Sequence, residues 1–407
     1  MADSNKLNLL ALSSVPLVMT LGNSMLIPVL PAIEKELGIT SFQVSLIITV
    51  YSIVAILLIP LAGYLSDRIG RKTVMVPCLI IAGAGGALSA WASTNSGNPF
   101  LWILAGRILQ GIGSAGAAPV VIPLIGDLFD DDEKISSGLG LIETANTAGK
   151  VLSPIIGAFL ASFVWYLPFW FIPFFSIIGV LLVFFMVKVP KKEKEAQSLK
   201  EFLKCVKDIF KKSGRWLYAI FAIGGIIMLV LFGILFYLSD TLEKKYGIDG
   251  VAKGFMLAIP LLALSVSSFI AGKVIGSKKH LMKVLIVMGM ALLAVSFVAI
   301  RLQHSFAFLI VFLVLSGIGI GVALPSLDAL ITEGIEKEHR GTITSFYSSM
   351  RFIGVAAGPP LYAAIMPRSE HWIYYVSIGF SFTAMLIGMF FIRPQEKSGQ
   401  PSKLKAT

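Results

Sequence analysis

Twelve separate apolar stretches, each long enough to cross a lipid bilayer, constrain this chain more than any other feature of its sequence. A membrane-spanning helix needs roughly 20 consecutive, mostly apolar residues. The approximate limits of the stretches are 9–31, 43–65, 74–93, 100–126, 137–162, 166–187, 216–239, 251–272, 282–300, 305–331, 342–366 and 372–392. Only 14% of the residues are charged, whereas soluble domains are about one quarter charged. The sequence therefore predicts an all-α membrane protein with twelve transmembrane helices.

The basic residues divide unequally between the two sides of the membrane. We call side A the side that holds both chain ends, and side B the opposite side. Side A carries 25 lysines and arginines and side B six, while Arg107, Lys150 and Arg351 lie inside the apolar stretches. Lysine and arginine accumulate in cytoplasmic loops. We therefore expect a multi-pass protein of the cell membrane with side A, and both termini, in the cytoplasm.

The longest polar break follows the sixth stretch and divides the chain. We expect a six-helix bundle over 1–187, a basic linker over 188–215, a second bundle over 216–393 and a cytoplasmic tail over 394–407. The linker segment SLKEFLKCVKDIFKK places its apolar residues on one helical face. This pattern favours a helix that lies on the inner membrane surface beside anionic lipid, with binding to a calmodulin-like partner as the weaker alternative.

Several classes of function are disfavoured by composition. The net charge is +11, but the basic residues fall in short breaks between apolar runs, which argues against a nucleic-acid partner. There is no phosphate-binding P-loop motif. The two cysteines and four histidines lack metal-ligand spacing. We expect no metal, no cofactor and no enzymatic activity.

Two parts of the sequence repeat about half a chain apart. GIGSAGAAP begins at Gly111 and GIGIGVALP begins at Gly317, an offset of 206 residues. GKVLSP at Gly149 is similar to GVAAGP at Gly354, at an offset of 205. Two homologous six-helix bundles explain both repeats. Parallel repeats of this kind place a substrate site at their interface near the bilayer midplane.

Three motifs identify a family. They are GYLSDRIGRK at 63–72, LAGRILQGIGSA at 104–115, and GLIETANTAGKVLSPIIG at 140–157. On these motifs the chain resembles the major facilitator superfamily, in its twelve-span drug:proton antiporter branch, and is similar to multidrug exporters of Gram-positive bacteria. The resemblance extends to about Arg393. It implies a fold of two pseudo-symmetric bundles, transport by alternating access, and a monomer.

The first motif, by resemblance, is a conformational latch of the outward-facing state. Its residues are Gly63, Asp67, Arg68, Gly70 and Arg71. We expect both glycines in tight turns, where glycine is not penalised. Asp67 and Arg71 are expected to pair with each other and with the other bundle. The alternative is that the basic residues only set topology.

The resemblance gives the other two motifs roles in transport. In the second motif it assigns proton coupling to Arg107, and the alternative is a structural arginine satisfied by carbonyl groups. An arginine within a span costs at least about 2.5–3.5 kcal/mol and should face water or a partner. The third motif is typical of antiporters and favours export. Gly140, Gly149, Pro154 and Gly157 match this motif, while Ser153 and Ala158 replace two family glycines.

Polar residues form one face of the fifth stretch. Glu143, Asn146, Thr147 and Lys150 are spaced 0, 3, 4 and 7 residues apart, which is helical spacing. The eleventh stretch repeats this spacing at Thr344, Tyr347, Ser348 and Arg351. We expect two walls of one water-filled cavity. The alternative is that Glu143 and Lys150 only neutralise each other, although about 10 Å of helix rise separates them.

Candidate site residues follow from these stripes. Glu143 is the first candidate for a proton carrier and Asp328 the second; the polar position of the first stretch holds Asn23 rather than an acid. A carboxyl group that moves between apolar and cationic surroundings changes its proton affinity. The substrate-binding candidates are Asn23, Met25, Asn146, Thr147, Lys150, Phe232, Phe236, Tyr347 and Arg351.

The main functional prediction is a proton-coupled exporter of small amphipathic compounds, that is, multidrug efflux. The alternative is a dedicated exporter or flippase of one endogenous anionic metabolite or lipid, such as a siderophore or a lipid-linked glycan. A surplus of buried positive charge at Arg107, Lys150 and Arg351 motivates this alternative. A receptor or scaffold without transport activity is disfavoured because nothing appended to the bundles resembles a signalling domain.

Overall fold

The fold is known from a computed structural model that describes residues 2–95, 97–128, 132–187, 210, 214–276, 278–302, 305–335 and 340–392. All regular secondary structure in these ranges is helical, which confirms the predicted all-α class. The predicted amphipathic helix of the linker lies outside the described residues, apart from Phe210.

The helices of the N-terminal half cover the first six predicted spans. They are α1 (Ala2–Ser24), η1 (Ile27–Val29), α2 (Leu30–Leu37), α3 (Ser41–Ile69), α4 (Arg71–Asn95), α5 (Pro99–Leu128), α6 (Asp132–Ala161) and α7 (Leu167–Met186). The first span is broken, because Pro28 and Pro31 lack the amide protons that a continuous helix requires.

The C-terminal half repeats the pattern with six helices. They are α9 (Arg215–Lys244), α10 (Gly250–Ile275), α11 (Lys279–Leu302), α12 (Phe306–Gly334), α13 (Arg340–Ile365) and α14 (Glu370–Phe391). Together with the first half they give the predicted twelve spans within the described residues. Most helices extend a few residues beyond the apolar core that the sequence predicts.

Ten of the twelve spans are apolar enough to be recognised as membrane helices by length and composition. The two long helices outside this set are α6 and α13, which have 30 and 26 residues. Both are long enough to cross a bilayer. Both are too polar to be recognised by composition, because they carry the two polar stripes described above.

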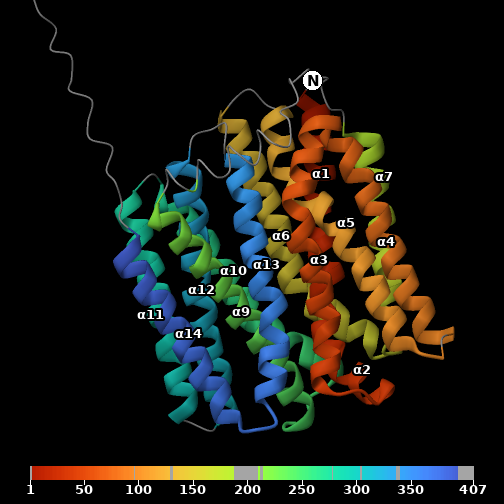
Figure 1. Cartoon of the computed structure of the whole chain (residues 1–407), viewed down its shortest axis with the longest axis vertical. Helices are drawn as coiled ribbons and strands as arrows, with labels where there is room; N and C mark the ends of the chain where they lie inside the picture. Colours follow the sequence, from red (N-terminus) through yellow and green to blue (C-terminus); the bar gives the residue numbers. More distant parts are fainter. Residues whose placement is uncertain are drawn as a thin grey trace, which may run out of the picture.

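The two halves are built alike. In the first half α5 packs against α3 and α4, and α1 packs against α6. In the second half α12 packs against α10 and α11, and α9 packs against α13. The halves meet where α3 packs along α13 and α6 packs along α10. Figure 1 shows the two groups of helices side by side, with α13 next to α3.

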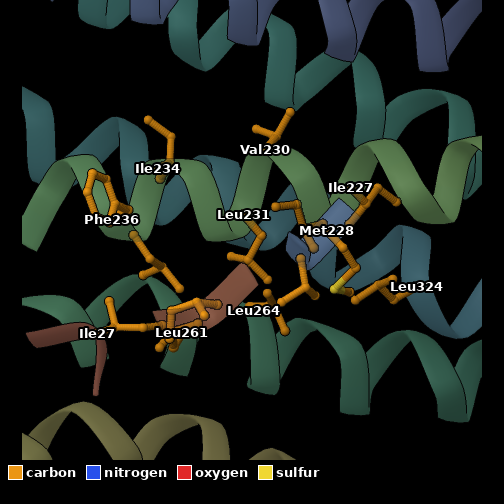
Figure 2. Close-up of a cluster of buried hydrophobic side chains, with 14 of the residues drawn as sticks. Ile27, Ile227, Met228, Val230, Leu231, Ile234, Phe236, Leu261, Leu264 and Leu324 are labelled. Atoms are coloured by element: carbon orange, nitrogen blue, oxygen red, sulfur yellow. The ribbon is translucent and has the colours of Figure 1, made fainter. Parts of the chain in front are cut away.

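Contacts between the halves close side B. Lys244 of α9 forms an ion pair of 2.9 Å with Glu34 of α2. The Ser239 hydroxyl of α9 donates to the Ile27 carbonyl over 3.0 Å. Beneath this contact, Ile27 lies against Leu261 of α10 within the apolar cluster that includes Phe236 (Figure 2). Together these groups seal the space between the halves on that side.

The first motif joins three helices at side A within the N-terminal half. Gly70 has φ +104° and makes the expected tight turn between α3 and α4. Arg71 forms ion pairs with Asp67 and, over 3.0 Å, with Asp127 of α5. The expected Asp67–Arg71 pair is therefore present, and the further partner of Arg71 belongs to the same half rather than to the other half.

The expectation of a turn at Gly63 is wrong. Gly63 lies inside α3, where an added Cβ would stand 3.3 Å from the Ser345 hydroxyl of α13. Its small size allows the two halves to approach on side A. A glycine is therefore favoured at position 63 by helix packing and not by backbone conformation.

The third motif packs α6 against the first span. Gly157 faces the backbone carbonyl of Met25, and an added Cβ would overlap that oxygen. The Ser153 hydroxyl donates to the Gly149 carbonyl over 2.5 Å, so serine fits where the family has glycine. On the opposite face the Pro154 carbonyl would be 2.6 Å from a Cβ added to Gly254 of α10.

We predict that Gly157→Ala destabilises the protein by about 1–3 kcal/mol, because an overpacked helix contact must separate. Gly140→Ala is the matched control, since nothing lies within 4 Å of an added Cβ there. The control should be neutral or slightly stabilising, because alanine favours a helix. Thermal unfolding of the purified variants measures both. Equal melting temperatures for the two variants would contradict the packing role of Gly157.

Candidate functional site

A central cavity of about 260 Å³ lies between the two halves. Its walls run from Ile122 and Ile142, nearer side A, to Ile27 and Leu235, nearer side B. Beyond Ile27 the halves meet on side B through the Ser239–Ile27 and Lys244–Glu34 contacts. The polar wall residues are Thr20, Asn23, Ser24, Tyr51, Ser114, Glu143, Asn146, Lys150, Ser348 and Arg351.

The α6 stripe forms one polar wall of this cavity. Thr20 of α1 donates to the Asn146 side-chain oxygen over 2.7 Å, which fixes the orientation of that amide. The Asn146 amide nitrogen and the Thr147 hydroxyl each lie 3.4 Å from the Glu143 carboxylate and donate to it. Hydrogen bonds therefore link α1 to the acidic group of α6.

Lys150 lies two turns further along the same wall. Among the described residues it has no direct ion pair, but it is near enough to Glu143, Asp328 and Arg351 to feel their charges. The large helix rise between Glu143 and Lys150 rules out simple mutual neutralisation by contact. Lys150 thus presents a cationic group to the cavity.

The opposite wall carries a second cation. Arg351 of α13 lies 3.8 Å from Asp328 of α12, and both side chains remain partly accessible. Arg351 also lies over the Tyr347 ring, 5.6 Å from its centroid. The cavity therefore receives one cation from each half, Lys150 and Arg351.

Arg107 lies behind the cavity wall and is fully buried. Its guanidinium donates to the side-chain oxygens of Asn23 and Gln110 and to the Ile47 carbonyl. It also stacks 4.4 Å from the centroid of the Tyr51 ring. Carbonyl groups do satisfy this arginine, as the structural alternative expected, but they leave its positive charge uncompensated.

Six of the nine predicted substrate-binding residues are at or beside the wall. Asn23, Asn146, Lys150, Phe232 and Arg351 line the cavity, and Thr147 contacts it through Glu143. Met25, Phe236 and Tyr347 are buried away from the wall. The Met25 carbonyl contacts Gly157 of α6, and Phe236 lies in the apolar cluster that includes Ile27 and Leu261. Tyr347 packs against Phe221.

Several wall residues were not among the predicted ones. Thr20 and Pro16 lie one and two turns before Asn23, so the α1 stripe has helical spacing. Ser114 lies two turns after Arg107 and shares its face. The helical spacing of these three residues in the sequence could have identified them as wall residues. Tyr51 had none, because it is an isolated polar group in an apolar stretch.

A large cavity between two repeated helical bundles, closed on one side and lined by ionisable groups, is the architecture of a secondary transporter. A family model described as Major Facilitator Superfamily matches residues 12–285 and 232–406. The chain belongs to the major facilitator superfamily and is a multi-pass membrane transporter.

Relatives extend over nearly the whole chain. The bacillibactin exporter of Bacillus subtilis (strain 168) is 64% identical over 398 residues, which are 98% of this chain and 99% of that protein. The class B tetracycline resistance protein of Escherichia coli is 24% identical, covering 97% and 99%. A bacterial homologue of the human lysosomal transporter Spinster, solved inward-facing and unoccupied, has a TM-score of 0.76 at 14% identity, covering 95% and 98%.

We predict that the cavity wall of α6 is wet. In a variant that lacks Cys78 and Cys205, Asn146→Cys should react with a water-soluble maleimide applied from side A. Leu152→Cys is the matched control, because Leu152 is exposed on the outer surface of the same helix and should face lipid. Labelling in inside-out vesicles measures both rates. Equal rates would show that α6 does not separate a wet face from a lipid face.

Proposed function

We propose that this protein exports one metabolite, bacillibactin or a close chemical relative, across the cell membrane. The observation that carries the proposal is the 64% identity with the Bacillus subtilis bacillibactin exporter over almost the full length of both chains. This similarity favours a dedicated exporter over broad efflux. The likeness to a tetracycline resistance protein, at 24% identity, makes multidrug efflux the second candidate.

The charges of the cavity support an acidic substrate. Lys150 and Arg351 come from opposite halves, and Arg107 adds a buried charge behind the wall. Glu143 and Asp328 offset two of these three cations. One positive charge remains in surplus, which disfavours the lipophilic cations that many drug exporters carry.

Access to the site follows from the contacts between the halves. With side A in the cytoplasm, the Lys244–Glu34 ion pair and the Ser239–Ile27 hydrogen bond join the halves on the outer side of the membrane. Export then requires the halves to rock until side B opens and side A closes. The pairs that Arg71 makes with Asp67 and Asp127 hold α3, α4 and α5 as one unit during this motion.

Glu143 is the proposed proton site, with Asp328 as the second candidate. Glu143 faces the cavity and acts on Lys150 through its charge. The negative charge of Glu143 disfavours an acidic substrate group beside Lys150. Protonation of Glu143 therefore favours binding of that group. The α6 motif, by contrast, predicts exchange of protons and substrate in opposite directions, and the direction is tested below.

We expect the protein to restore bacillibactin secretion in a Bacillus subtilis strain that lacks its own bacillibactin exporter. Lys150→Gln should lower secretion about tenfold or more, because a charged contact to the substrate is lost. Lys35→Gln, an exposed change on α2 at side B, should have no effect. Mass spectrometry of the medium gives the yield. Cationic-dye efflux without bacillibactin secretion would instead select multidrug efflux.

We expect substrate affinity to be higher when Glu143 carries no negative charge, and therefore to be higher at acidic pH. In Glu143→Gln the affinity should be high and independent of pH, because the amide mimics the protonated acid. Glu36→Gln, at an exposed position outside the cavity, should keep the wild-type pH response. Binding titrations of purified protein measure this. An unchanged response in Glu143→Gln would transfer the proton role to Asp328.

Uptake into inside-out vesicles measures whether protons and substrate move in the same or in opposite directions. In inside-out vesicles, where export becomes uptake, an acidic lumen drives uptake if protons and substrate exchange in opposite directions. An acidic exterior drives uptake if they move together.

A further inference from the structure

The cavity wall beside Arg107 holds polar side chains that have no role in the proposed function. Asn23 bonds to the buried guanidinium through its side-chain oxygen. An amide has an oxygen acceptor at one corner and an NH2 donor at the other. Because the cation requires the oxygen, the orientation of Asn23 is fixed. The Asn23 NH2 group is then what this residue offers to the cavity it lines.

Ser114 supplies a second donor on the same wall. The Tyr51 hydroxyl donates to the Ser114 oxygen over 2.6 Å. With its oxygen occupied as an acceptor, Ser114 keeps its own proton to donate. Tyr51 and Ser114 both line the cavity, and the Tyr51 ring covers the guanidinium. Asn23 therefore contacts the buried guanidinium directly, and Ser114 is connected to it through Tyr51.

The charge behind these donors is not cancelled locally. The partners of Arg107 named above are amides, a carbonyl group and an aromatic ring, all of them neutral. In a low-dielectric interior an uncompensated charge acts over several ångströms. Donors that are oriented in advance and supported by a cation recognise an anionic oxygen.

We propose that Asn23 and Ser114, with Arg107 behind them, form an anion subsite in the N-terminal half. Resting on the proposed function, it defines the substrate further as a compound with at least two separated acidic groups. One group binds between Lys150 and Arg351 and the other binds at Asn23. The Asn23 subsite is deeper, because the span that carries it packs against Ser153 and Gly157, beyond Lys150 on α6.

Asn23 sets the charge preference of this subsite. Aspartate has nearly the same shape as asparagine but would neutralise Arg107 and replace the NH2 donor with an acceptor. Asn23→Asp should therefore repel an anion while preserving the packing around Arg107. Ser114→Ala removes the second donor and leaves the charge in place.

The test uses salicylate and its neutral analogue salicylamide as probes in binding titrations of the purified full chain. The titration should resolve two salicylate sites, of which Asn23→Asp should weaken one about tenfold or more, while salicylamide binding should weaken less than twofold. Ser114→Ala should weaken salicylate binding by a smaller factor of about three to ten. The matched control is Asn95→Asp, at the exposed end of α4, which should change neither affinity.

Thermal unfolding first establishes that each variant is folded. A folded Asn23→Asp protein that loses both probes equally would show a structural role and overturn the subsite. So would unchanged salicylate binding.

A double variant separates this subsite from the other cations. Salicylate has one acid, so it samples both subsites, and Lys150→Gln should remove only one of them. On that background the loss caused by Asn23→Asp should persist in full, since independent sites give additive effects. Loss of all salicylate binding in Lys150→Gln alone would contradict a second subsite. Because salicylate stands in for no natural substrate, a failure to secrete bacillibactin would overturn the proposed function without overturning the subsite.

Discussion

Positive charge within an apolar layer is the constraint on which this structure depends. Each of three cations within the spans is accommodated differently. Arg107 is enclosed by carbonyl and amide oxygens and by the Tyr51 ring, and Arg351 pairs with Asp328. Lys150, without a direct partner among the described residues, relies on the cavity. A charge at mid-membrane is tolerated only with partners or water, so the cavity is a condition of the fold as well as a site for substrate.

The walls of that cavity are rigid on one side of each half. Gly157 brings α6 onto the Met25 carbonyl within the N-terminal half, and Gly354 brings α13 onto the Gly225 carbonyl of α9 within the C-terminal half. Such contacts leave no space for side-chain rearrangement, so each half moves as a body. The polar contacts between the halves on side B are of another kind. Glu34–Lys244 is a partly exposed ion pair and Ser239–Ile27 is a single hydrogen bond, and contacts of this kind add little stability.

Much of the architecture was predictable because the bilayer simplifies the problem. Span length and the repeats at Gly111 and Gly317 predicted the twelve helices and the two halves. Helical spacing predicted that Glu143, Asn146 and Lys150 share one face, and they do line the cavity.

Other features depend on contacts between helices, which periodicity within one helix does not reveal. Gly63 was assigned to a turn because the motif is a loop signature, but its neighbour is Ser345 of the other half. Met25, Phe236 and Tyr347 were assigned to the site from residue type, and they pack away from it. Tyr51 reaches the cavity only because α3 lies beside α5, which no single stretch shows.

The polarity of α6 and α13 also bears on how the protein is made. A helix that carries charged residues enters a bilayer poorly by itself, and these two are the spans that composition does not identify. The helices against which they pack most closely within their own halves, α1 and α9, precede them in the chain. During synthesis each polar helix therefore finds its partner already inserted. The order of the spans lets the two least hydrophobic segments enter the membrane by assembling with an earlier one.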